Sequence, residues 1–168
     1  AWVAILILAL FTHPLLDLFT IYGTQLLAPF SAARFEISGV SIIDPIYTVI
    51  LLAAMALRGL PRLWNYAQHL ASAGLILTTA YLFYGWYLNT QAVALAEAQL
   101  DTQQVAYGKV EAFTTIFQPF LRRIVVTEGD KTRVGFVSTF SPQPIIWDCR
   151  KNIAQEDMAA ILLTEPAQ

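Results

Sequence analysis

The sequence predicts a mainly α-helical membrane protein with about three apolar helices, followed by a small α+β soluble region that contains a β-hairpin. Composition is the first reason, because 57% of the 168 residues are hydrophobic and only 13% are charged, whereas about a quarter of a soluble domain is charged. The second reason is distribution, because residues 45–96 contain only two charged side chains, Arg58 and Arg62. We therefore expect a membrane-embedded region at residues 1–88, which carries the candidate site, and an extracytoplasmic region at residues 89–168.

Three segments have the apolar character of membrane helices. Residues 2–19 are almost entirely apolar up to His13, and residues 44–57 and 66–88 follow as the second and third segments. About 20 apolar residues cross the hydrocarbon layer of a bilayer, so the first segment is about long enough to cross or re-enter it. Asp44 is well placed as the N-cap of the second helix, because a proline that suits the first helical position follows it.

The second region changes character after Asn89. A polar, alanine-rich segment predicts a helix that ends near Gly108, and β-branched runs on either side of the turn EGDK predict a hairpin. The expected strands are residues 124–127, residues 133–139, residues 145–147 and a short strand at 35–43 in the first loop. Arg122 and Arg123 begin the hairpin, where we expect them at a solvated edge or against lipid headgroups.

Two arginines set the expected topology. Cytoplasmic loops of membrane proteins carry an excess of Lys and Arg, so we expect Arg58 and Arg62 in the cytoplasm and a multi-pass protein whose C-terminal region is extracytoplasmic. The net charge of −2 gives no basic footprint for nucleic acid, and the single Cys149 excludes a disulfide framework. The chain opens and ends within helical patterns, so we expect a fragment that is truncated at both ends.

Two ionisable side chains interrupt the first apolar segment. His13 and Asp17 are four residues apart, so on a helix they project from one face and can present an imidazole nitrogen and a carboxylate oxygen to one point. Zn²⁺ accepts both ligand types. A hydrogen bond between the two side chains, which would neutralise two buried polar groups, is the alternative. Asp44 is expected at the same membrane face, and its two oxygens allow it both to cap a helix and to coordinate a metal.

A dense set of motifs fills residues 12–52. The segment reads THPLLDLFTIYGTQLLAPFSAARF, followed by IIDPIYTVILL, and contains in order H-P-L-L-D, Y-G-T-Q, P-F-S, R-F and I-I-D-P-x-Y-T. It resembles the YdjM-like family of inner-membrane-associated metal-dependent hydrolases, which is distantly similar to zinc-dependent phospholipase C and P1 nuclease. A looser match covers residues 105–140. The resemblance implies a zinc site in which His13 and Asp17 are ligands.

The resemblance also implies roles for other motif positions. Asp44 is expected as a further metal ligand, and Tyr22, Thr24 and Arg34 are expected in the catalytic site. The implied reaction is the attack of metal-activated water on a phosphoester or ester. The implied location is a bacterial inner membrane, with the lipid bilayer as partner and a lipid-like or envelope molecule as substrate. Arg34 suits an anionic substrate, and anchoring at the headgroup level is its equally weighted alternative.

Part of the family pattern is missing from this sequence. The P-D-x-D and H-R-x-x-T-H elements of the family do not occur, and His69 lies beside the arginine turn, on the wrong side of the membrane for this site. A catalytic zinc ion normally takes three protein ligands, so we expect the chain to be catalytically incomplete. The rival hypothesis is a non-catalytic membrane protein whose soluble β region binds a partner, with His13 and Asp17 joining helices.

Overall fold

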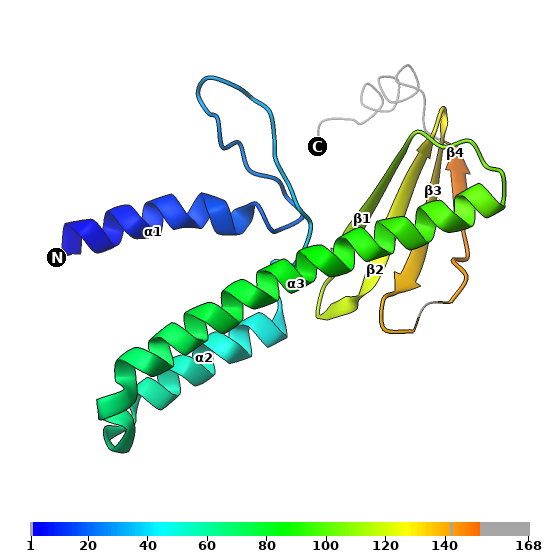
Figure 1. Cartoon of the computed structure of the whole chain (residues 1–168). Coiled ribbons are helices and arrows are strands. Elements are labelled where there is room, and N and C mark those ends of the chain that lie inside the picture. Colours follow the sequence, from blue (N-terminus) through cyan, green and yellow to red (C-terminus); the bar gives the residue numbers. More distant parts are fainter. Residues whose placement is uncertain (1, 142, 152–168) are drawn as a thin grey trace, which may run out of the picture.

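A computed structural model describes residues 2–141 and 143–151 of the chain (Figure 1). A helical N-terminal region is followed by a small antiparallel sheet in the order β1-β2-β3-β4. The elements are α1 (Trp2–Asp17), α2 (Pro45–Gly59), the 3-10 helix η1 (Pro61–Tyr66), α3 (Ala67–Thr102), β1 (Lys109–Thr115), β2 (Gln118–Glu128), β3 (Lys131–Ser138) and β4 (Asp148–Lys151). The predicted order of helices before strands is therefore confirmed.

Helices α2 and α3 pack side by side, while α1 extends away from them (Figure 1). The predicted N-cap is confirmed, because the Asp44 side chain accepts a hydrogen bond from the Tyr47 backbone N–H at 3.0 Å and Pro45 opens α2. Gly74 lets the helices approach closely, since a Cβ atom there would lie 2.6 Å from the Ala54 Cβ. Helix α1 has no buried residue.

Three membrane-spanning helices were expected from the sequence. Among the described residues, no helix is by itself long and apolar enough to cross a bilayer. Helix α2 and the segment Pro61–Thr102 meet the criterion only together, and they bend by 108° at the break between them. Helix α1 is apolar but has only 16 residues.

Helix α3 combines the apolar helix expected at residues 66–88 with the polar, alanine-rich helix expected after Asn89. It runs for 36 residues without a break, through Asn89, and ends at Thr102 rather than near Gly108. One stripe of buried residues recurs every three or four positions along the helix: Gly74, Thr78, Leu82, Gly85, Leu88, Ala92, Ala96 and Leu100. The stripe faces α2 at one end and the sheet at the other, so a single helix face supports both halves of the structure (Figure 1).

The sheet covers the C-terminal part of α3 (Figure 1). The predicted hairpin is confirmed, because β2 and β3 pair around a turn in which Glu128 lies opposite Lys131. Strand β1 pairs with β2 and had not been separately predicted. The core between helix and sheet contains Ala92, Ala96, Leu100, Ala112, Ile124, Val126, Val137 and Ile145.

Two strand predictions are wrong for identifiable reasons. Residues 145–147 are not a strand, because the Gln99 side chain binds both the N–H and the carbonyl of Ile145, at 2.7 and 2.8 Å; the strand begins at Asp148. Residues 35–43 contain only a bridge between Thr24 and Phe35. The backbone beyond Phe35 bonds to the end of α1 and to side chains instead.

Candidate functional site

His13 and Asp17 lie at the C-terminal end of α1. The Nε2 atom of His13 is 3.4 Å from the Oδ2 atom of Asp17, and the two side chains are 75% and 48% exposed. The i, i+4 spacing thus brings an imidazole nitrogen and a carboxylate oxygen together, as helix geometry requires. Because both side chains remain accessible, the pair can take a third group between or beside its polar atoms.

The loop after α1 brings Asp44 toward this pair. The N–H groups of Ile37 and Val40 donate to the carbonyls of Leu18 and Phe19, at 2.8 and 3.0 Å. This holds the segment that leads into α2 against the end of α1. Asp17 and Asp44, 27 residues apart in sequence, consequently line one cavity of about 130 Å³.

Asp44 is buried and its two carboxylate oxygens have different partners. Oδ1 accepts from the Tyr47 N–H at 3.0 Å, and Oδ2 accepts from the Tyr81 hydroxyl at 2.8 Å. Tyr81 is not among the predicted site residues, because its position on the inner face of α3 depends on packing. Since each carboxylate oxygen has a second lone pair, Asp44 retains acceptor capacity toward the cavity.

The chemistry of a metal site is only partly present. Within residues 2–141 and 143–151, no group of three or more His, Cys, Asp or Glu side chains is arranged to hold a metal ion. A catalytic zinc site normally takes three protein ligands. His13 and Asp17 therefore supply two donors of the right kind, and Asp44 shares the cavity of Asp17 without completing a cluster.

The remaining predicted site residues lie in the loop between α1 and α2, apart from the cavity. Arg34 is exposed, and its Nη1 atom donates to the backbone carbonyl of Tyr22 at 3.4 Å. The backbone of Thr24 pairs with Phe35. Tyr22, Thr24 and Arg34 are absent from the lining of the cavity that contains Asp17 and Asp44.

Arg122 corrects one expectation from the sequence. It is fully buried rather than at a solvated edge. Its Nη1 atom donates to the carbonyls of Ser38 and Gly39 at 3.1 and 3.0 Å, and its Nη2 atom donates to the Gly85 carbonyl at 3.1 Å. Burial lowers the pKa of Arg122 to about 10, and the Tyr81 hydroxyl and the Asp44 carboxylate oppose that shift. The guanidinium remains charged at neutral pH.

A sequence signal for this arrangement existed. Side chains two apart on a strand share a face, so Arg122 lies on the same face as the core residues Ile124 and Val126. Arg123 lies on the opposite face, with its guanidinium carbon 5.6 Å from the centre of the Phe113 ring. Alternation therefore distinguishes the two arginines, although which face would be covered depended on the position of α3.

Close backbone contact completes the network around Arg122. A Cβ atom on Gly85 would lie 2.6 Å from the Gly39 carbonyl oxygen, and one on Gly39 would lie 2.9 Å from the Trp86 nitrogen. Asn89 donates to the Ile37 carbonyl at 3.2 Å. The segment before Asp44 is thus held by α3 and by β2 together.

Apolar helices such as α1 and α2 are typical of the class of membrane-associated helical proteins. The comparisons narrow this class: the family model described as YdjM inner membrane protein matches residues 1–92, more than half of the chain. The chain belongs to this family, and membrane association follows from that membership. Neither the curated proteins nor the solved structures include a match. The family match ends within α3, so the sheet and Arg122 lie beyond it.

Proposed function

We propose that the chain is part of a membrane-bound, metal-dependent hydrolase in which His13 and Asp17 are two ligands of a divalent metal, with zinc as the expected ion. The observation that carries this proposal is the 3.4 Å approach of His13 Nε2 to Asp17 Oδ2 beside a cavity that Asp17 shares with Asp44. Family membership supports the membrane setting. The donors among the described residues are too few for a closed site, so the proposal requires further ligands.

The described side chains have separable roles in this proposal. A bound zinc ion would supply a water of lowered pKa, near 7, and polarise a phosphoryl or acyl oxygen. Asp44, held by the Tyr47 N–H and the Tyr81 hydroxyl, is placed to orient a polar group in the cavity or to act as a further ligand. Leu16, Val40 and Leu82 make part of the lining of the same cavity apolar.

The loop residues are proposed to act on the substrate rather than on the metal. Arg34 is exposed and bonds only weakly to Tyr22, at 3.4 Å, so its guanidinium is available for an anionic group such as a phosphate. Tyr22 and Thr24 lie in the same loop and are proposed to contact the substrate as well. A lipid-like or envelope molecule is the substrate class that suits a site at a membrane surface.

Zinc content tests the metal site directly. The full-length protein would be purified, dialysed against metal-free buffer and analysed for zinc per chain, together with the variants His13→Ala and His69→Ala. Loss of a residue that merely orients a ligand costs about 10–100-fold in metal affinity, so His13→Ala should lower zinc retention at least as much. His69→Ala, the matched control on α3, should retain zinc. Stoichiometric zinc in His13→Ala would remove the site assignment.

One observation favours a second function, a non-catalytic membrane protein whose β region binds a partner. Phe113, Arg123 and Phe136 pair across strands β1, β2 and β3, in one row on the sheet face away from α3. Aromatic residues and arginine are enriched at protein interfaces. A photo-crosslinker at position 123 separates the two functions: a discrete adduct in cells, together with zinc-free purified protein, would favour the binding function.

A further inference from the structure

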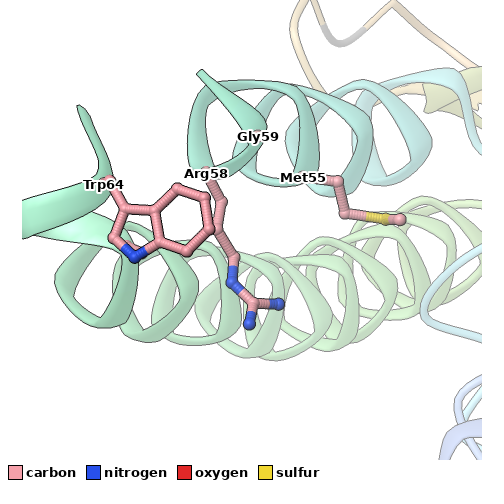
Figure 2. A pocket seen from close by; sticks show the side chains of 5 residues that line it. Met55, Arg58, Gly59 and Trp64 are labelled. Atoms are coloured by element: carbon pink, nitrogen blue, oxygen red, sulfur yellow. The ribbon is translucent and has the colours of Figure 1, made fainter. Parts of the chain in front are cut away.

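The turn between α2 and α3 contains a cavity with a charged group in it. The cavity has a volume of about 380 Å³ and is lined by Met55, Arg58, Gly59, Trp64 and Ala67. Figure 2 shows the Arg58 side chain extending from α2 toward the helix below it, with the Trp64 indole on one side and Met55 on the other. Trp64 is 75% exposed, so its ring is available for contact.

A second cavity continues from the first along the α2–α3 seam. It measures about 240 Å³ and is lined by Leu51, Ala54, Met55, Arg58, Ala71, Gly74 and Leu75. Met55 and Arg58 belong to both cavities, so the two cavities are adjacent and are considered together as one groove. Apart from Arg58, the side chains of the second cavity are apolar. The groove therefore has a cationic part at Arg58 and an apolar part along the rest of the second cavity.

The charge of Arg58 is not compensated nearby. Residues 45–96 contain no Asp or Glu, and no carboxylate within the described part of the chain forms an ion pair with Arg58. A guanidinium is weakly hydrated, stacks on aromatic rings and binds phosphate with two parallel hydrogen bonds. An anionic phosphate group thus matches this end of the groove in charge and in hydrogen-bonding geometry.

We propose that this groove, named here the α2–α3 groove and defined by the lining residues of the two cavities, binds one anionic phospholipid. The phosphate lies on Arg58 beside Trp64, and an acyl chain lies along Leu51, Ala54 and Leu75. A free phosphate ion would leave the apolar part uncovered, whereas an acyl chain covers it. Basic pockets between membrane helices are known to hold lipid headgroups, and the family is one of inner membrane proteins.

The α2–α3 groove is separate from the candidate metal site. Asp44 caps the start of α2, and Arg58 lies in its last turn. The 15 residues of α2 span about 22 Å. The groove and the pair His13–Asp17 are therefore at different ends of the helix, and the lipid proposal stands or falls independently of the hydrolase.

Binding of phosphatidylglycerol by the full chain tests the proposal. The protein in detergent would be titrated with phosphatidylglycerol or phosphatidylcholine, and bound lipid would be counted by native mass spectrometry. We expect one phosphatidylglycerol per chain in preference to phosphatidylcholine. Arg58→Gln should weaken that binding about tenfold, which is typical of losing a charge-assisted hydrogen bond, and Arg58→Lys should restore part of it.

Arg62 provides the matched control. It lies in the same turn and carries the same charge, but it lines neither cavity, so Arg62→Gln should change the affinity by less than about threefold. Ala71→Phe, which fills the groove without altering charge, should also weaken binding. Equal losses in Arg58→Gln and Arg62→Gln would overturn the proposal, as would equal binding of the two lipids. Displacement of the lipid by millimolar inorganic phosphate would overturn the proposal as well. So would a dimer that binds no lipid, because a second copy of the chain would then be the occupant of the groove.

Discussion

Arg122 on β2 and Gly39 in the loop before α2 are joined by a hydrogen bond of 3.0 Å, although 83 residues separate them in the sequence. The same guanidinium binds Ser38 in that loop and Gly85 on α3. One side chain therefore holds three backbone carbonyls from two elements. The sheet lies outside the residues that match the family model, yet it holds the loop that leads to Asp44, which lies within the matched residues.

Arg122→Met should destabilise the protein strongly. The substitution leaves the buried loop carbonyls of Ser38 and Gly39 without the guanidinium donor, and each unsatisfied group costs about 1–3 kcal/mol. We expect a loss of about 3 kcal/mol or more, measured by chemical or thermal unfolding of the full chain in detergent. Arg123→Met is the control, because its ring contact with Phe113 contributes only about 0.5–1 kcal/mol. Similar losses in both variants would contradict the network.

Gly85→Ala should disturb the contact between the loop and α3. The added methyl group would lie 2.6 Å from the Gly39 carbonyl oxygen and 3.0 Å from the Val40 Cγ1 atom. Such overpacking typically costs about 1–3 kcal/mol. Gly59→Ala is the comparison, since its Cβ atom would meet nothing within 4 Å, and we expect no loss of stability there. An unfolding midpoint unchanged in Gly85→Ala would show that this contact is loose.

Asp44 and Tyr81 should be coupled energetically. Their hydrogen bond is 2.8 Å long and partly buried, so a double-mutant cycle of Asp44→Asn and Tyr81→Phe should give a coupling energy of about 0.5–1.5 kcal/mol. Asparagine is the suitable replacement because it also caps helices well, which preserves the contact with the Tyr47 N–H. Strict additivity of the two substitutions in the unfolding free energy would exclude the coupling.

Cys149 offers a test of the predicted topology. It is the single cysteine of the sequence and is exposed on β4. If Arg58 and Arg62 face the cytoplasm, a membrane-impermeant maleimide should label Cys149 in spheroplasts without permeabilisation. Cys149→Ser controls for background labelling, and Arg62→Cys in that variant should react only after permeabilisation. Labelling in the opposite order would reverse the predicted orientation.

Local signals predicted the start of α2 and the hairpin. The N-cap at Asp44 followed by Pro45 marked the start of α2, and the EGDK turn placed the β2–β3 pairing. These features depend on neighbouring residues, which a sequence displays directly. The failures at residues 35–43 and 145–147 have the opposite origin: their backbone groups bond to distant partners, such as Arg122 and Gln99, so local pattern had no bearing on their conformation.

The same limit applies to the candidate site, of which only the contacts between neighbouring residues could be predicted. The approach of His13 to Asp17 follows from helical spacing, whereas the shared cavity of Asp17 and Asp44 depends on the loop that returns to α1. Arg122 was misjudged because arginine is rarely fully buried. Its position in the alternation of β2 places it on the same face as the core residues. The carbonyls that accept its hydrogen bonds belong to residues 38, 39 and 85, which no local pattern connects to residue 122.

The distance in sequence between Arg122 and the Ser38 and Gly39 carbonyls has a consequence during biosynthesis. A ribosome adds about 5–20 residues per second, so synthesis of the 83 residues that follow Gly39, up to and including Arg122, delays the arrival of the guanidinium by several seconds. Throughout that interval these two carbonyls have only water as a donor in place of the guanidinium. The Arg122 bonds to the loop before Asp44 therefore form late in translation, once β2 has been made and has reached α3.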